Sequence, residues 1–338
     1  MSTSRGEISR RKLASYRYEF SDMQEKGFGL AYRLIMPVVS APLLLIDILV
    51  LLLTGRDLRW FDSDFTTPEK IVPVRTTAAK LLERLEPMRR PAIEIREADG
   101  TPGFSKLGGR PDVAPGFEWP RWRDRPLSFL AQIDLAALPQ QILDFSPPGS
   151  GRLYFFYDVE QSTWGFDPAD AGSWQVLYVD HDEPLSPAAF PEDLPEHGRY
   201  AAKPVSFIAI STLPDVDRLD LDPVELSDAD WDEVYNASDP TEGPGHRIGG
   251  YPRPIQDDEM EAECQLASNG YYCGRGQGSE HAAFLAANPP AWQLLLQLDS
   301  DDDCDMMWGD LGTLYFWIRE ADLARRDFSQ VWMILQCS

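Results

Sequence analysis

Short apolar segments separated by turn residues dominate the chain after residue 100. Six of them are six to eight residues long, rich in aromatic and aliphatic side chains, and bounded by Gly, Pro or Asp, which is typical of β-strands. They lie at residues 152–158, 174–180, 204–210, 292–299, 312–319 and 331–336. Because few long helical segments separate them, the pattern predicts an α+β fold made mainly of antiparallel sheets.

A few short helices are expected between these strands. Thr76 or Thr77 is placed to cap a helix that ends at Pro87, and further helices are expected at 279–284 and 320–326. Another helix is expected to start at a cap and to point three apolar side chains inward. Its cap is Ser227, and its inward residues are Trp231, Val234 and Tyr235.

Three sequence blocks occur twice in the same order, which predicts an internal duplication. The first block reads KLGGRP and then RIGGYP, the second SFLAQIDL and then QLLLQLDS, and the third GRLYFFYD and then GTLYFWIR. The two repeats are expected at about 104–210 and 245–338. Their paired glycines, Gly108-Gly109 and Gly249-Gly250, match no phosphate-loop motif and are interpreted as tight backbone turns.

The N-terminal part differs from the rest of the chain. We expect a basic arm at 1–33, a hydrophobic helix at 34–54, a linker at 55–75 and one domain at 76–338. The apolar run 34–53 is long enough to span a bilayer, although Pro37, Pro42 and Asp47 interrupt it. It is interpreted either as a membrane anchor of a cytoplasmic protein or as an arm that docks on the domain or on a second copy.

Charge narrows the classes of partner. The 338 residues carry a net charge of -24, which argues against nucleic-acid binding because phosphates require Lys and Arg. Acidic residues are densest at 215–242. Such a surface attracts a basic protein by its long-range field, and the alternative is that the charge only keeps the chain soluble.

Catalytic and zinc motifs are missing from the sequence. It contains no H-E-x-x-H and no G-x-S-x-G, which disfavours an enzyme without excluding a site assembled in three dimensions. The four cysteines form no C-x-x-C pair and are expected to be reduced thiols. Cys264, Cys273 and His281 could supply three zinc ligands, but their spacing matches no standard site.

Two polar patterns are candidate ligand sites. The pairs Gln132/Asp134 and Gln297/Asp299 sit at equivalent strand positions, where they either converge into a pocket between the repeats or satisfy backbone groups. The second pattern has the spacing of a Ca²⁺ loop, although Cys304 stands where that loop requires Gly. Its candidate ligands are Asp299, Asp301, Asp303, Asp305 and Asp310; no other cofactor is expected.

Two sets of residues are candidates for binding a protein partner. Trp119 and Trp122 lie among Arg and Asp residues, a combination typical of interface hot spots, and the alternative is that they pack under their loop. The second set is acidic and lies on the helix expected after Ser227: Asp228, Asp230, Asp232 and Glu233.

The chain resembles the YwqG-like family of uncharacterised bacterial proteins over about residues 104–337. The blocks that carry the resemblance are KLGGRPDVAPGFEWP, LAQIDL, LYFFYD, WGFDPADAGSW, HRIGGYP, LLLQLDSDDD and WGDLGTLYFWI. The resemblance implies an α+β fold with an internal duplication and no established catalytic residues. It also implies a role as an interaction or immunity protein of the kind discussed beside toxin genes.

These observations leave three hypotheses, in order of preference. The first is a non-catalytic interaction protein, in one version immunity-like, whose acidic surface binds a basic protein. The second is a small-molecule binder or enzyme with a site between the repeats. The third is a membrane-tethered, Ca²⁺-responsive protein that uses the aspartate loop. Oligomeric state does not follow from the sequence.

Overall fold

The structure is a computed structural model, and it describes residues 74–100, 104–180, 184–215, 224–241, 243–256, 259–274 and 278–338. Nearly all of them belong to one compact unit, Arg75–Ser338. Within the described part of the chain, no helix has the length and apolar character needed to cross a bilayer. The expected basic arm, the hydrophobic segment 34–54 and most of the linker lie outside the described residues.

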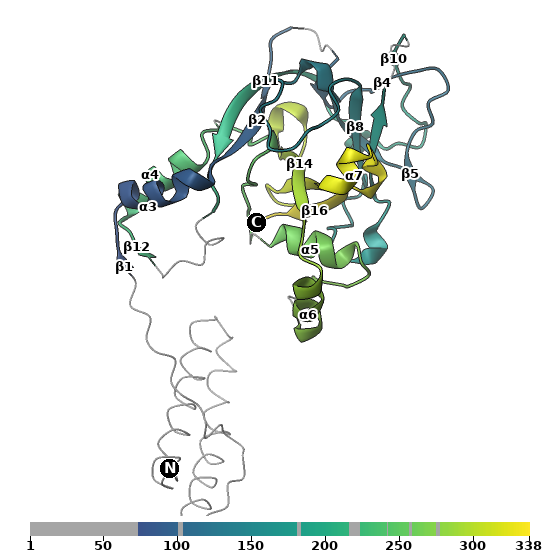
Figure 1. Cartoon of the computed structure of the whole chain (residues 1–338). Coiled ribbons are helices and arrows are strands. Elements are labelled where there is room, and N and C mark those ends of the chain that lie inside the picture. Colours follow the sequence, from purple (N-terminus) through teal and green to yellow (C-terminus); the bar gives the residue numbers. More distant parts are fainter. Residues whose placement is uncertain are drawn as a thin grey trace, which may run out of the picture. The chain divides into compact units, whose positions relative to one another are not determined.

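A ten-stranded sheet organises this unit (Figure 1). Its strands are β2 (Arg90–Glu97), β3 (Lys106–Leu107), β7 (Ser128–Asp134), β8 (Arg152–Tyr157), β9 (Trp174–Val179), β11 (Lys203–Thr212), β13 (Arg247–Gly249), β14 (Trp292–Asp299), β15 (Thr313–Arg319) and β16 (Trp332–Gln336). They lie in the order β16-β15-β14-β13-β2-β11-β3-β7-β8-β9. Each pairing between these strands is antiparallel, which confirms the predicted α+β class with mainly antiparallel pairing.

Strands β2 and β11, which share the longest pairing of the sheet, form its middle. Their register runs from Thr212 opposite Arg90 to Val205 opposite Glu97. On one side lie β13 to β16, and on the other lie β3 and β7 to β9. Both flanks carry a bulge, between Phe129 and Ala131 in β7 and between Leu294 and Leu296 in β14.

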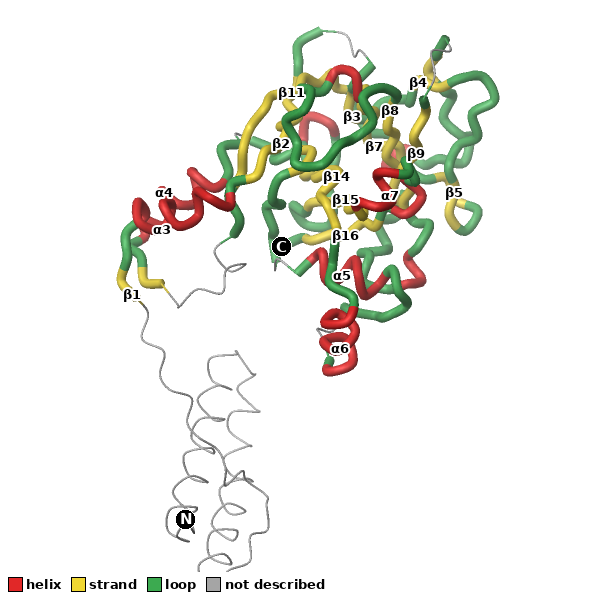
Figure 2. The backbone as a smooth tube through the Cα atoms, in the orientation of Figure 1, coloured by secondary structure: helices red, strands yellow, loops and turns green. Residues whose placement is uncertain are grey.

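The sheet curls until its two edge strands meet (Figure 2). The ring centroids of Trp174 in β9 and Trp332 in β16 are 4.9 Å apart. The indole of Trp174 donates to the carbonyl of Val331, and that of Trp332 donates to the carbonyl of Gly165, both at 2.8 Å. The large apolar core therefore contains residues from both flanks of the sheet.

Five α-helices and several short elements complete the described fold. The helices are α3 (Ala78–Leu85), α4 (Asp228–Ser238), α5 (Met260–Ala267), α6 (Ser279–Ala287) and α7 (Glu320–Ala324). Short strand pairs are β1 (Val74–Arg75) with β12 (Val224–Glu225), β4 (Asp112–Val113) with β10 (Ser186–Pro187), and β5 (Arg121–Trp122) with β6 (Arg125–Pro126). The 3-10 turns are η1 (Glu86–Met88), η2 (Leu135–Ala137), η3 (Pro168–Asp170), η4 (Glu196–Gly198), η6 (Asp302–Cys304) and η7 (Phe328–Gln330).

Helices α3 and α4 lie side by side beyond the start of β2 and the end of β11 (Figure 1). Their small core contains Leu81 and Leu85 from α3, Leu213 after β11, and Val234 from α4. Because this core is separate from the core within the sheet, the helix pair forms a second layer of structure with a surface of its own.

The predicted cap of α4 is confirmed, but the predicted direction of its aromatic side chains is wrong. Ser227 Oγ accepts a hydrogen bond from the backbone N–H of Asp230 at 3.2 Å. Val234 is buried, whereas Trp231 is 39% exposed and Tyr235 is 63% exposed. The physical reason is that α4 contributes only Val234 to the small core it shares with α3.

The paired glycines form tight turns, as predicted. Gly108, Gly109, Gly249 and Gly250 all have positive φ, at 58°, 72°, 72° and 70°, a region that disfavours residues with a side chain. A Cβ on Gly250 would lie 2.6 Å from Thr212 Oγ1. This turn brings the chain after β13 close to the end of β11, beside α4.

Candidate functional site

The two predicted Gln-x-Asp pairs serve mainly to attach loops to strands. Gln132 Nε2 donates to the carbonyl of Phe104, and its Oε1 accepts from the N–H of Asp112, both at 2.8 Å. Gln297 Nε2 donates to the carbonyl of Gly245 at 2.8 Å, and its Oε1 accepts from the N–H of Arg253 at 2.9 Å. Both glutamines are fully buried, so their amides are committed to the backbone.

The aspartates of these pairs have different partners. Asp134 caps η2 by accepting from the N–H of Ala136 at 3.1 Å. Asp299 accepts from Arg253 Nη2 at 2.7 Å and from Thr313 Oγ1 at 2.7 Å. The two pairs lie on β7 and β14, with four strands between them in the sheet order.

The predicted calcium loop does not bring its aspartates together. Asp299 is paired with Arg253, whereas Asp301 Oδ2 lies 3.2 Å from His246 Nε2. Asp303 is mostly exposed, and Asp305 and Asp310 are exposed too. Among the described residues, the side chains that approach one another as metal ligands are instead Glu97, Asp301 and Cys304.

The predicted tryptophan site packs beneath its loop. Trp122 is 9% exposed and belongs to a small apolar cluster with Phe129 and Phe156. Trp119 Nε1 donates to the carbonyl of Leu127 at 2.8 Å. The guanidinium carbon of Arg123 lies 4.0 Å from the centroid of the Trp122 ring. These contacts give both tryptophans a structural role.

Helix α4 exposes the other predicted partner-binding residues, with one exception. Asp228, Asp232 and Glu233 are exposed. The Asp230 carboxyl instead accepts from Ser227 Oγ at 2.6 Å and from the N–H of Ala78 at 3.1 Å. These bonds hold the pKa of Asp230 below its ordinary value and attach α4 to the start of α3.

The exposed residues of α4 form a stripe. Asp228, Trp231, Asp232 and Tyr235 follow the spacing i, i+3, i+4 and i+7, which places them on one side of a helix. Together with Glu233 they are called the α4 surface below. It therefore combines exposed carboxylates with two exposed aromatic rings.

A cavity of about 160 Å³ lies beside the α4 surface. Helix α4 supplies Trp231, Val234 and Tyr235, and the segment after the Gly249-Gly250 turn supplies Tyr251 and prolines. Tyr251 N–H donates to Thr212 Oγ1 at 2.8 Å, which fixes this segment on the end of β11. The cavity walls are thus mainly aromatic and aliphatic.

The two arginines that line this cavity, Arg247 and Arg253, are paired with aspartates of the fold. Arg247 is 1% exposed and donates through Nη2 to Asp239 Oδ2 at 2.5 Å. Arg253 lies 3.8 Å from Asp239 and 2.7 Å from Asp299. Burial alone would raise the pKa of Asp239, but the charge of Arg247 and the hydrogen bonds from Thr241 and Arg247 outweigh burial, so the pKa is lowered. Two arginines and two aspartates therefore neutralise one another.

The other flank of the sheet has an equivalent set of polar contacts, called the polar frame below, around its own glutamine and tyrosine. Lys106 faces Gln132 in the β3–β7 register, as Arg247 faces Gln297 in the β13–β14 register. Tyr154 donates to the carbonyl of Asp112 at 2.7 Å, and Tyr315 donates to that of Arg253 at 2.6 Å. In place of the network of two arginines and two aspartates, this flank has the ion pair between Lys106 Nζ and Asp112 Oδ2, at 2.5 Å.

The sequence did not reveal the charged residues beside α4. Arg247 and Arg253 flank one of the repeated glycine turns, in the sequence HRIGGYPR. Their position beside this repeated turn is the feature of the sequence that could have identified them. Their partner Asp239 belongs to the acidic stretch but is separated from Asp299 by 60 residues, so only the fold brings the four together.

Comparisons with known proteins place the chain in a family without defining its activity. None of the curated proteins matches it in sequence. A family model described as a domain of unknown function, DUF1963, matches residues 105–337, which cover all strands of the sheet except β2. The chain therefore belongs to this family, DUF1963.

Proposed function

We propose that this protein is a non-catalytic binding protein that recognises a basic protein partner through the α4 surface. The observation that carries the proposal is the pair of exposed aromatic side chains, Trp231 and Tyr235, on an acidic helix that borders a cavity. Trp and Tyr are enriched among residues that dominate binding energy at protein interfaces. Leaving both rings in water has no structural benefit, because the small helical core is complete without them.

The size of the cavity favours an anchoring side chain over a free small molecule. Pockets for drug-sized ligands measure about 300–1,000 Å³, whereas this cavity measures about 160 Å³. An engineered cavity of about 150 Å³ holds benzene, which is comparable to one apolar side chain. We infer that an apolar side chain of the partner inserts between α4 and Tyr251.

Electrostatics indicates what surrounds that anchor. The charged residues that line the cavity are two aspartates and two arginines, Asp215, Asp239, Arg247 and Arg253, so their formal charges sum to zero. The excess charge lies on Asp228, Asp232 and Glu233 at the exposed side of α4. A partner that matches this pattern carries Lys or Arg residues around an apolar residue. Such contacts accelerate association and weaken with salt.

The proposal extends to the finer family relationship and to the architecture. An immunity-like role is what the resemblance to the YwqG-like family implies, and a basic toxin is one partner of suitable charge.

We also propose that the two flanks arose by duplication. Support comes from the matched contacts Lys106–Gln132 and Arg247–Gln297, from the matched bulges and from the two glycine turns.

The test is affinity capture of the tagged full-length protein from its native cells at low and high salt. The test variant neutralises α4: Asp228→Asn, Asp232→Asn and Glu233→Gln. The control makes the same change in net charge at exposed residues elsewhere: Glu118→Gln, Glu192→Gln and Glu196→Gln. We expect one basic protein to bind the wild type and the control, and to be lost with the α4 variant and at high salt. A partner retained equally by all three proteins, or no protein partner, contradicts the proposal.

A further inference from the structure

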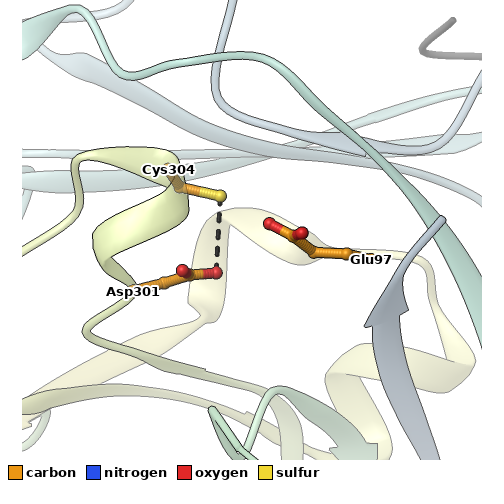
Figure 3. Close-up of side chains that lie close together, drawn as sticks. All are labelled: Glu97, Asp301 and Cys304. Atoms are coloured by element: carbon orange, nitrogen blue, oxygen red, sulfur yellow. Dashed lines mark hydrogen bonds between the residues drawn. The ribbon is translucent and has the colours of Figure 1, made fainter. Parts of the chain in front are cut away.

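Three side chains with metal-binding atoms converge at the end of β2 (Figure 3). Glu97 is the last residue of β2, Asp301 follows β14, and Cys304 ends the short turn η6. One ligand atom from each lies within 4.8 Å of the others. Cys304 is fully buried and Asp301 is 6% exposed, whereas the Glu97 side chain is 38% exposed, so the cluster lies where the core meets the solvent.

The cluster is held in place by contacts from outside it. His246 Nδ1 accepts a hydrogen bond from the N–H of Asp299 at 3.0 Å, so its ring proton is on Nε2. That Nε2–H points at Asp301 Oδ2, 3.2 Å away. His246 therefore orients the Asp301 carboxylate as a positioning residue, with its own lone pair already used. Residues that hydrogen-bond to the ligands of a metal ion commonly orient them in this way.

We propose that Glu97, Asp301 and Cys304 bind a zinc ion, with a water molecule as the fourth ligand. The Cys304 thiol donates to Asp301 Oδ2 at 3.5 Å, and zinc binding would release this proton to solvent. The resulting thiolate and the two carboxylates match the ligand types of Zn²⁺, and three protein ligands with one open position is a known zinc arrangement. From zinc–ligand distances of about 2.0–2.3 Å, tetrahedral ligand atoms lie about 3.3–3.8 Å apart. The cluster therefore has to close by only about 1 Å around the ion.

Access and ion selectivity both agree with this assignment. A cavity of about 280 Å³ is lined by Glu97, His246, Asp301 and Asp303, and it supplies a route for the ion and space for the water. Ca²⁺ and Mg²⁺ take oxygen ligands, and a soft thiolate is a poor ligand for them. Zinc is thus distinguished from the calcium expected from the aspartate spacing.

One cation already competes for part of the site. Lys203 Nζ lies 3.4 Å from Glu97 Oε1 and 3.8 Å from Asp303 Oδ1. Zinc binding would displace this ammonium group from Glu97 towards Asp303. Replacing Lys203 by an uncharged residue should therefore strengthen zinc binding, a result that a purely structural role for the cluster does not predict.

The experiment uses the full-length protein after chelator treatment. Zinc affinity is measured by competition with a chromophoric chelator, and Co²⁺ is added separately to detect the thiolate-to-cobalt charge-transfer band. We expect one zinc per chain and a cobalt–thiolate band. Cys304→Ser should remove the band, and Glu97→Gln should weaken zinc binding by roughly 10- to 100-fold.

The controls separate this site from the other cysteines and from loss of folding. Asp305→Asn changes an exposed carboxylate of the same loop outside the ligand set and should keep the wild-type affinity, whereas Lys203→Met should increase it several-fold. Glu97 is partly exposed, so Glu97→Gln should remain folded even if Cys304→Ser does not. No zinc bound by the wild type, a band that survives in folded Cys304→Ser, or unchanged affinity in Glu97→Gln would overturn the assignment. None of these results depends on a protein partner.

Discussion

The two flanks of the sheet share one polar frame but differ in the charged residues that it holds. On both flanks a buried glutamine ties its strand to the segment that follows the neighbouring strand, and a tyrosine hydroxyl donates to the same segment. At the first flank the charges are a single pair, Lys106 with Asp112. At the second they are a network of Arg247, Arg253, Asp239 and Asp299.

This difference distinguishes the contacts that build the sheet from those that position the α4 surface. Asp239 comes directly after α4, so the second network connects the sheet to the helix that carries the exposed aromatic residues. The Lys106–Asp112 pair joins β3 to β4 and does not involve α4. Hydrogen bonds common to both flanks therefore build the fold, and the charges particular to the second flank position the α4 surface.

The largest expected effect comes from breaking the second network. Arg247→Met leaves the nearly buried Asp239 without its main partner, and loss of one member of a buried ion pair costs about 3–5 kcal/mol. Lys106→Met leaves Asp112, whose side chain is 18% exposed, and should cost less, about 1–3 kcal/mol. Urea unfolding of both variants measures the difference. Equal losses would mean that the two clusters are energetically equivalent.

Replacing the glutamines should give equal effects on both flanks. Gln132→Leu and Gln297→Leu each remove one bond to a carbonyl and one from an N–H. Leaving such buried groups unsatisfied should reduce the free energy of unfolding by about 2–3 kcal/mol in each variant. The same urea experiment tests this. A large loss at one flank only would argue against a common frame.

The pH dependence should be smaller and specific to the second flank. The pKa of Asp239 is lowered by Arg247 despite burial, so its ionised form stabilises the fold above the ordinary carboxyl pKa of 3.8. That contribution is lost as the pH falls through the lowered folded-state pKa. The gap in unfolding free energy between wild type and Asp239→Asn should therefore shrink in acid. A gap that widens on acidification would contradict the lowered pKa.

The smallest effect on stability is expected at the α4 surface. Tyr235 is 63% exposed, and surface substitutions usually change stability by less than about 0.5 kcal/mol. Tyr235→Ala should therefore unfold like the wild type. Its affinity for the captured partner should nevertheless fall by about 2 kcal/mol or more, as at interface hot spots. Unchanged affinity would remove Tyr235 from the site.

Local patterns predicted several strands and one helix cap, whereas Thr77 occupies the N-cap position of α3 without a side-chain cap hydrogen bond in the described structure. The expected strand 292–299 coincides with β14, and Ser227 caps α4. Strand β2 was not among the predicted strands, and its sequence RPAIEIRE places charged residues, Glu94 and Arg96, beside its apolar ones. In the fold, Glu94 is buried opposite Arg247 in the β2–β13 register and lies 2.8 Å from Arg96.

The candidate sites were less predictable because they depend on long-range pairing. The distance in sequence between Glu97 and Cys304 is more than 200 residues, and only the order of β2 and β14 in the sheet brings them together. The direction of Trp231 and Tyr235 also could not be predicted. It depends on how little of α4 its neighbour α3 covers, which helical periodicity does not specify.

The most direct test of the α4 surface is photo-crosslinking in the native cells. A photoreactive phenylalanine analogue replaces Tyr235 in one version of the full-length protein and Tyr272 in another. Tyr272 is also exposed, at 49%, but lies outside α4. The proposal predicts a crosslink to one basic protein from position 235 and none to that protein from position 272. No specific crosslink from 235, or the same product from both positions, would contradict it.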